Sequence, residues 1–167
     1  METQTVILTT NQINQKIKRL AFQIYEDNVA EKEIIIAGIV QQGYRLAEKI
    51  SIALREISPL QVKLISIDID KQSQISRDIK LPLSSEELNN KVVVVVDDVL
   101  NSGKTLMYAI RPFLEADIRK LRTVVLVDRN HKRYAVSADF VGLSMSTTLQ
   151  EHVSVVIDAE QEGVYIS

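Results

Sequence analysis

The stretch VVVVVDDVLNSGKTL, Val92 to Leu106, decides the fold class of this chain of 167 residues. Its five consecutive valines are β-branched and apolar on both faces, so they indicate a strand, Lys91 to Asp97, that is covered on both sides. Two carboxylates, a short loop and the start of a helix follow. A buried strand that leads directly into a helix is the repeating unit of a parallel α/β sheet.

Further strands are predicted on both sides of this stretch. Apolar or alternating runs predict Glu33 to Ile39, Val62 to Ile69 and Leu121 to Asp128, followed by three short late strands, Phe140 to Gly142, Val153 to Ile157 and Val164 to Ile166. Because helical segments separate the earlier strands, the fold class is α/β, with a mainly parallel central sheet and helices on both faces. Ligands of such folds bind at the carboxyl ends of the strands.

Apolar residues three or four positions apart predict the helices. One helix carries Ile13, Ile17, Leu20 and Ile24 on one face, with Asn11 as its cap, and a second carries Leu46, Ile50, Leu54 and Ile57 and ends at Pro59. A third helix is predicted over Thr105 to Ala116, with a kink at Pro112. The polar stretch Lys71 to Asn90 shows no periodicity, which favours a functional loop.

Bulk properties predict one cytoplasmic domain, residues 1–167, with no membrane segment. The chain is 46% hydrophobic and has no cysteine and two histidines, which excludes disulfides and argues against structural zinc. No basic, apolar leader opens the chain, and no apolar run approaches the roughly 20 residues that span a bilayer. The net charge of −2 means that any nucleic-acid binding would need a local basic face.

The loop after the valine strand has the composition of a phosphate socket. Gly103 lets the backbone approach a ligand closely, and the loop Asn101 through Thr105 leads into a helix whose first amides are unpaired. Ser102 and Thr105 add hydroxyl donors, and Lys104 adds charge. The sequence therefore predicts a site for a phosphate monoester.

The carboxylates Asp97 and Asp98 imply that the ligand carries more than phosphate. They would repel a bare phosphate, but they suit a ligand that presents hydroxyls or carries Mg²⁺, as a phosphorylated ribose does. A nucleotide-triphosphatase P-loop is rejected, because Asp98 stands where that motif needs a glycine. The other alternative, a solvated strand end with Ser102 as a helix cap, is weaker than the functional interpretation of the whole string.

The same string, VVVVVDDVLNSGKT, resembles the phosphoribosyl pyrophosphate motif of type I phosphoribosyltransferases. The resemblance extends to VLVDRNH (Val125 to His131), SADFVG (Ser137 to Gly142), VILTTNQI and AGIVQQGYRLA. These match the pyrimidine operon attenuation proteins that are also uracil phosphoribosyltransferases. The resemblance covers nearly the whole chain and implies a small hood region beside the central sheet.

The resemblance also implies a role for each site residue. Asp97 and Asp98 would be the catalytic carboxylates on the ribose hydroxyls. The other predicted contacts divide among the 5′-phosphate (Asn101, Ser102, Gly103, Lys104 and Thr105), pyrophosphate (Val40, Gln41, Gln42 and Gly43, in an unusual peptide geometry) and the base (Asp128, Arg129 and His131).

The implied activity is displacement of pyrophosphate from phosphoribosyl pyrophosphate by a nucleobase, with uracil giving uridine monophosphate in pyrimidine salvage. The Mg²⁺ cofactor would bind chiefly through substrate oxygens and water, so no metal ligand is assigned to the protein. Two alternatives stay open: an RNA-binding regulator of transcription attenuation with weak or no catalysis, and a purine phosphoribosyltransferase. The family also implies a homodimer or higher homo-oligomer, for which Val6 to Leu8 could pair between subunits.

This chain departs from the family pattern at two places near the substrate. The pyrophosphate turn usually has lysine, threonine and arginine before its glycine, whereas here Val40, Gln41 and Gln42 stand there. The loop that begins at Asp70 is shorter than its counterpart and lacks a tyrosine–arginine–aspartate stretch, although Arg77 or Lys80 could replace a charge. These changes bear on the rate of catalysis more than on substrate binding.

RNA binding would depend on Lys16, Lys18 and Arg19 in the first helix and on Lys132 and Arg133 after the base segment. The family's histidine on that helix is Phe22 here, and an arginine of the later segment is Ser137. With a net charge of −2, a solvated helix face is the favoured interpretation of these cations. His131 is equally consistent with a base contact and an ordinary loop residue, and His152 has no predicted partner.

Overall fold

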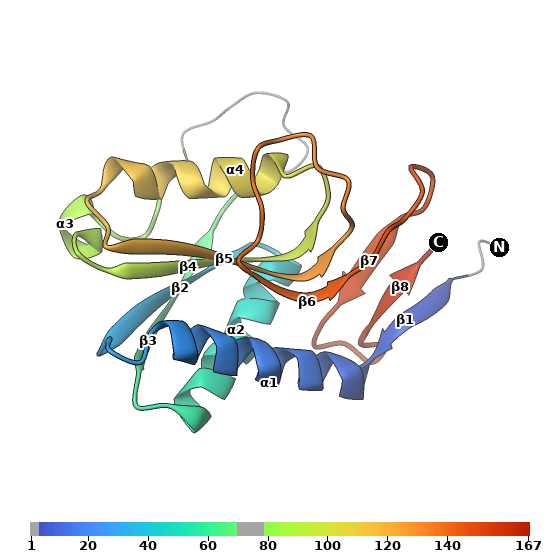
Figure 1. Ribbon diagram of the computed structural model, residues 1–167, viewed down its shortest axis with the longest axis horizontal. Helices are drawn as coiled ribbons and strands as arrows, with labels where there is room; N and C mark the ends of the chain where they lie inside the picture. The colour runs from blue at the N-terminus through green and yellow to red at the C-terminus, as the bar shows by residue number, and fades with distance from the viewer. Residues whose placement is uncertain (1–3, 70–78) are drawn as a thin grey trace.

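A computed structural model describes residues 4–69 and 79–167 as a central parallel sheet with a small antiparallel sheet beside it (Figure 1). The central sheet has the strand order β3-β2-β4-β5-β6 and the small one β1-β8-β7. The elements are β1 (Thr5–Thr9), α1 (Thr10–Asp27), β2 (Glu33–Ile39), α2 (Gln42–Ile57), β3 (Gln61–Ile67), α3 (Ser85–Leu88), β4 (Val92–Leu100), α4 (Lys104–Ile110), the 3₁₀ helix η1 (Arg111–Glu115), β5 (Lys120–Asp128), β6 (Phe140–Ser144), β7 (Val153–Val156) and β8 (Gly163–Ile166).

The predicted fold class is confirmed. All four pairings in the central sheet are parallel. Helices α1 and α2 cover one face, and α4 with η1 covers the other (Figure 1). The valine strand is the centre of the sheet, since β4 lies between β2 and β5.

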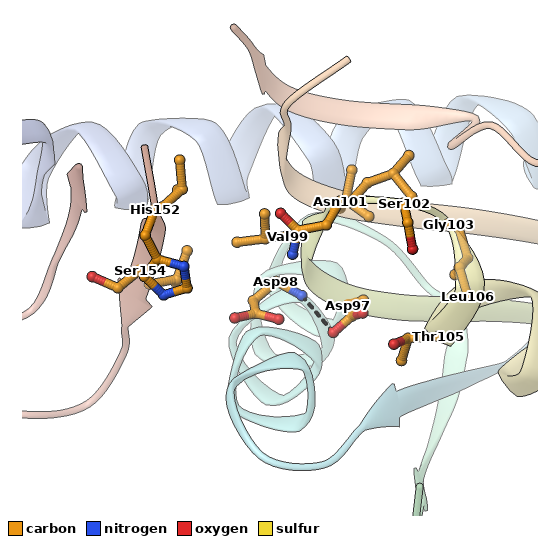
Figure 2. A pocket seen from close by; sticks show the side chains of 14 residues that line it. Asp97, Asp98, Val99, Asn101, Ser102, Gly103, Thr105, Leu106, His152 and Ser154 are labelled. Atoms are coloured by element: carbon orange, nitrogen blue, oxygen red, sulfur yellow. Dashed lines mark hydrogen bonds between the residues drawn. The ribbon is translucent and has the colours of Figure 1, made fainter. Parts of the chain in front are cut away.

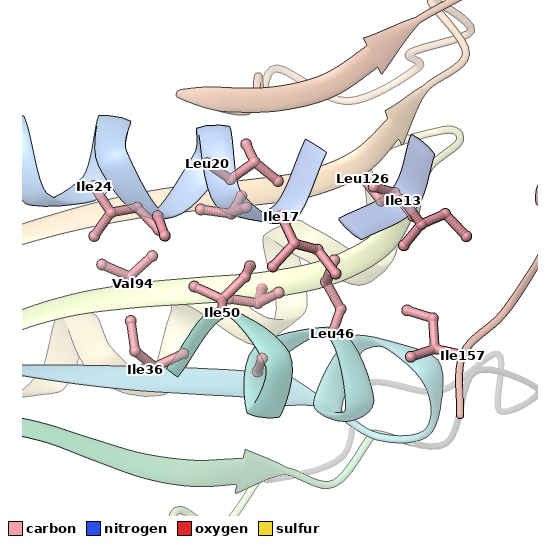
Figure 3. Packing of buried hydrophobic residues seen from close by; sticks show 14 of the residues in the cluster. Ile13, Ile17, Leu20, Ile24, Ile36, Leu46, Ile50, Val94, Leu126 and Ile157 are labelled. Carbon is pink, nitrogen blue, oxygen red and sulfur yellow. The ribbon is translucent and has the colours of Figure 1, made fainter. Parts of the chain in front are cut away.

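Two hydrophobic cores form because the valines of β4 alternate between the faces. Val94 and Val96 pack with Ile17, Ile50 and the rest of the α1–α2 side, as Figure 3 shows for Val94. Val93 and Val95 pack instead with the α4 side, which contains Phe113. Since all five valines are buried, β4 is fixed from both faces and holds the residues at its carboxyl end rigidly.

The small sheet forms the hood. Val6 and Leu8 of β1 pair with Tyr165 and Val164 of β8 in the same chain, and β1 is an edge strand of this sheet, so pairing of this segment between subunits stays a prediction. The hood closes one end of the main core, because Val155 and Ile157 pack into the cluster beneath α1 and α2.

Several predicted boundaries are wrong, each for a local reason. Thr9, not Asn11, caps α1, because its hydroxyl and the Gln12 side chain form a reciprocal capping box. The third helix is not one kinked α-helix: α4 ends at Ile110, and Pro112 lies in a separate 3₁₀ turn that tolerates its missing N–H.

The polar stretch between β3 and β4 is only partly described. Residues 71–78 lie outside the described part, and so does the proposed charge replacement by Arg77. The later part of this stretch contains the short helix α3, which was not predicted. Ser84 and Glu87 cap it, each side chain accepting a hydrogen bond from the backbone N–H of the other residue. Among the helices in the described ranges, none has the length and apolarity needed to cross a bilayer.

Candidate phosphoribosyl site at the carboxyl end of β4

Asp97 and Asp98 lie inside β4, which continues to Leu100 rather than ending at Asp97 as predicted. Asp97 is buried, with 3% of its surface exposed, and its Oδ1 accepts a 2.9 Å hydrogen bond from the backbone N–H of Asp98 (Figure 2). Asp98 is half-buried. One carboxylate is thus held by the strand backbone, while both border the same cavity.

The loop after β4 is shaped by Gly103. Its φ of 91° is left-handed, which suits glycine, and α4 begins at the next residue, Lys104, one position earlier than predicted. A Cβ on Gly103 would lie 2.6 Å from Val136 Cγ1. The missing side chain therefore makes room for the segment that covers the loop, whereas the close approach of Gly103 to a ligand stays a prediction.

The covering segment also holds the loop by hydrogen bonds. The carbonyl oxygen of Ser102 accepts bonds from the backbone N–H groups of Arg133 at 2.8 Å and Tyr134 at 3.1 Å. The Ser102 hydroxyl accepts a 3.3 Å bond from the Lys104 N–H. The loop is therefore supported from outside before any ligand arrives, which reduces the ordering that binding would cost.

A cavity of about 270 Å³ lies between this loop and the hood. The hood residues His152 to Val155 line the cavity, as do Asp97, Asp98, Ser102 and Thr105. Figure 2 shows His152 and Ser154 on the side opposite the two carboxylates and the two hydroxyls. Carboxylates and hydroxyls on one wall suit a ligand that has both hydroxyl donors and phosphate oxygens.

The predicted pyrophosphate turn meets the carboxylates. The Val40–Gln41 peptide is cis, which agrees with the unusual peptide geometry that the resemblance implied. A Cβ on Gly43 would lie 3.0 Å from Asp97 Oδ1 and 3.0 Å from the Val96 carbonyl oxygen. The turn and the carboxylate pair are in contact because position 43 has no side chain.

The segment after β5 is tied to the residues before the hood. The Arg129 guanidinium donates to Thr147 Oγ1 at 3.0 Å, to Asn101 Oδ1 at 2.9 Å and to the Glu151 carbonyl at 2.6 Å. His131 Nε2 contacts the Thr147 carbonyl oxygen. Arg129 thereby joins the phosphate loop to the segment that enters β7.

The Glu151 carboxylate closes a turn over residues 148–151, just before β7. Glu151 accepts the Thr148 N–H at 2.6 Å, and this backbone hydrogen bond lowers the pKa of the Glu151 carboxyl below its usual value. The carboxylate therefore stays ionised at neutral pH, where it fixes the turn that carries the acceptors of Arg129.

The sequence as a whole matches known proteins over this same arrangement. Residues 3–160 match the family model described as the phosphoribosyl transferase domain. The chain belongs to the phosphoribosyltransferase family. It is 32% identical to the "Bifunctional protein PyrR" of Clostridium kluyveri over 94% of this chain and 92% of the relative. It is 31% identical to the protein of the same name from Haemophilus ducreyi, over 91% of this chain and 89% of that relative.

Solved structures show the same phosphoribosyltransferase fold. A Trypanosoma cruzi hypoxanthine phosphoribosyltransferase superimposes with a TM-score of 0.80 at 19% identity, over 96% of this chain and 82% of that one. A hypoxanthine-guanine phosphoribosyltransferase from Bacillus anthracis superimposes with a TM-score of 0.77 at 19% identity, over 98% of this chain and 96% of that one.

In this phosphoribosyltransferase the structure brings half of the predicted site together, and the other half, which includes Lys104 and Val40 to Gln42, does not line the cavity. The carboxylates, the phosphate loop and the glycine of the pyrophosphate turn surround one region at the end of β4. Arg129 and His131 instead make the contacts described above, and Asp128 accepts the Asn130 N–H at 2.9 Å. Their contact with a base stays a prediction.

Sequence reasoning missed the hood wall of the phosphoribosyltransferase cavity. His152 and Ser154 face the carboxylates across it, although His152 had no predicted partner. No local motif marks these residues. The antiparallel pairing of β7 with β8, extended by the hydrogen bond from the His152 N–H to the Ser167 carbonyl, brings them over the site.

Proposed function

We propose that this phosphoribosyltransferase moves the phosphoribosyl group from phosphoribosyl pyrophosphate to uracil, giving uridine monophosphate and pyrophosphate. One observation carries the proposal: a buried and a half-buried carboxylate share a cavity with a rigid, hydroxyl-bearing loop. A phosphorylated ribose is the ligand that uses both.

Each group has a defined task in the transfer. Asp97 and Asp98 accept the ribose hydroxyls and offset the positive charge that grows on the sugar as its bond to pyrophosphate breaks. The loop Asn101 to Thr105 binds the 5′-phosphate through N–H groups and the hydroxyls of Ser102 and Thr105. Because α4 has only seven residues, the loop's own donors contribute more than the helix dipole.

The cavity fits Mg²⁺ as part of the substrate. Its donors are hard oxygens, which this ion prefers, and within the described residues no cluster of three acidic or histidine side chains is placed to hold a metal. When bound, Mg²⁺ would neutralise charge on the leaving pyrophosphate. Substrate oxygens and water would be its main ligands, while Asp97 and Asp98 hold the ribose hydroxyls.

Uracil is favoured over a purine by the sequence relatives. Those at about 30% identity carry the name PyrR, whereas the purine phosphoribosyltransferases match at about 20% and share the fold. The test is product formation from Mg²⁺ and phosphoribosyl pyrophosphate with uracil, hypoxanthine and guanine in parallel. Uridine monophosphate supports the proposal, turnover of a purine alone replaces the base, and no product with any base refutes the enzymatic function.

The relatives' name "bifunctional" and the resemblance to attenuation proteins favour a second activity, binding of a pyrimidine-operon leader RNA. The exposed Lys18 and Arg19 lie on α1, whereas Arg133 belongs to the segment over α4, on the opposite face of the sheet. A single RNA site would therefore use one of these groups. Loss of salt-sensitive leader binding in Lys18→Ala with Arg19→Ala supports α1, and equal weak affinity of the unaltered protein for any RNA contradicts the activity.

Assembly into a homodimer or larger homo-oligomer, and action in the cytoplasm, remain predictions. Sedimentation of the purified chain tests the first of them.

A further inference from the structure

Gln42 connects the pyrophosphate turn to the hood. It is the first residue of α2, and its side-chain Oε1 accepts a 3.0 Å hydrogen bond from the backbone N–H of Ile157. Ile157 directly follows β7 and is buried, with 2% of its surface exposed. A buried N–H needs an acceptor, and the acceptor here comes from a side chain 115 residues away.

The two ends of this bond lie outside the cavity but close in sequence to residues on either side of it. Next to Gln42, Gly43 lies against Asp97 of the carboxylate pair. Just before Ile157, Ser154 and Val155 line the hood wall. The bond therefore links the pyrophosphate turn, which contacts Asp97, to the chain that leaves the hood wall.

A neighbouring ion cluster anchors the hood farther along. The Lys49 Nζ of α2 lies 2.6 Å from Glu162 Oε1 and 3.4 Å from Asp158 Oδ1. Burial of Lys49 opposes its charge, but the two carboxylates outweigh that effect and raise its pKa above the usual value. This cluster fixes the turn between β7 and β8, whereas the Gln42 bond acts on the strand that lines the cavity.

Glutamine is suited to this role in a way that the family's usual residue is not. The resemblance places an arginine at this position, and a guanidinium has only donors, so it cannot accept the Ile157 N–H. The glutamine amide can accept this bond, although it brings no charge to the pyrophosphate. The chain thus exchanges a cation for a connection between turn and hood.

We propose that Gln42 is a positioning residue that fixes the hood wall over the carboxylate pair and thereby sets the affinity for the nucleobase. The inference rests on the proposed phosphoribosyl transfer. Because the proposed function gives the loop wall of the cavity to the phosphoribosyl group, the hood wall opposite it is the side left for the incoming base. The proposal therefore assigns Gln42 to the base side of the reaction rather than to pyrophosphate, where the sequence pattern had placed it.

The test compares three variants for the KM of uracil, the KM of phosphoribosyl pyrophosphate, kcat and the hydrogen exchange of the Ile157 amide. Gln42→Met keeps the length of the side chain but removes the oxygen acceptor. Gln42→Glu keeps an acceptor oxygen, and Gln161→Met is the same change at an exposed glutamine of the hood turn. Wild-type turnover separately decides the proposed function.

Gln42→Met is expected to raise the KM of uracil about fivefold, the factor that one ordinary hydrogen bond contributes, and to speed Ile157 exchange by a similar factor. Gln42→Glu is expected to keep the KM of uracil and the Ile157 exchange rate at their wild-type values, while its negative charge raises the KM of phosphoribosyl pyrophosphate. Gln161→Met leaves all four quantities unchanged.

Three results would overturn the proposal. Unchanged Ile157 exchange in Gln42→Met would mean that the bond is absent in solution. Faster exchange with an unchanged KM of uracil would leave a purely structural bond, and a rise confined to the KM of phosphoribosyl pyrophosphate would make Gln42 a direct substrate contact. If the wild type turns over no base, the dissociation constant of uridine monophosphate replaces the KM of uracil, and the absence of binding overturns the positioning role as well.

Discussion

Replacing Gly103 by alanine should damage both stability and phosphate binding. The left-handed φ of 91° costs an alanine about 1–2 kcal/mol. Its Cβ would lie 2.6 Å from Val136 Cγ1, an overlap whose relief costs about 1–3 kcal/mol in a packed site. The free energy of unfolding is therefore expected to fall by about 2–5 kcal/mol.

A double-mutant cycle separates the two contributions. Val136→Ala removes the methyl group that alanine at position 103 would strike, so Gly103→Ala should cost only about 1–2 kcal/mol in that background, which is the backbone part alone. Urea unfolding of the four proteins gives the free energies. The KM of phosphoribosyl pyrophosphate, measured where the protein is folded, should rise only in the variants that carry alanine at 103.

Two outcomes would refute this reasoning. A loss of less than about 0.5 kcal/mol in Gly103→Ala is within the range of an ordinary surface substitution and would show that the loop does not hold the left-handed conformation. Equal losses in both backgrounds would show that Val136 does not cover Gly103.

Three further predictions concern charge. Asp97→Asn combined with Asp98→Asn should lower kcat/KM at least about a hundredfold with the fold intact by circular dichroism, and unchanged turnover would remove the ribose assignment. Val40→Lys should lower the KM of phosphoribosyl pyrophosphate by returning a cation to the turn, with Ile52→Lys on exposed α2 surface as the control. Asp27→Asn should cost about 1 kcal/mol at pH 7, because burial of Asp27 is outweighed by the Lys120 and Arg122 bonds that lower its pKa below 3.8. Since that contribution is present above pH 3.8 and lost as pH falls through the lowered pKa, urea unfolding should show the two proteins converging in acid.

The main sheet could be predicted because short runs of consecutive apolar residues mark its strands. Five adjacent valines can be satisfied only between two apolar layers, and the structure buries all of them. Boundaries were harder to predict, because they depend on side-chain bonds that composition does not reveal. Thr9 caps α1 through a bond to the Gln12 N–H, and neither residue stands out from Asn11 in the sequence alone.

The wall of the site that comes from one continuous segment could be predicted. Asp97, Asp98 and the loop to Thr105 are consecutive, so their proximity follows from strand and loop geometry. No single segment encodes the hood wall, because His152 comes to face the carboxylates across the cavity through the pairing of β7 with β8 and of β8 with β1. Pairings between distant segments depend on the whole core and cannot be inferred from any one window.

The altered pyrophosphate turn shows how these two kinds of information combine. From the sequence, Gln42 is a lost cation beside the leaving group, a change that bears on the rate of catalysis more than on substrate binding. In the structure, its Oε1 accepts the Ile157 N–H, so the same substitution also supplies a bond between the turn and the hood. Reduced charge for the leaving group and added order on the base side act on different substrates. Separate KM values for uracil and phosphoribosyl pyrophosphate therefore distinguish them, whereas a single activity measurement would merge them.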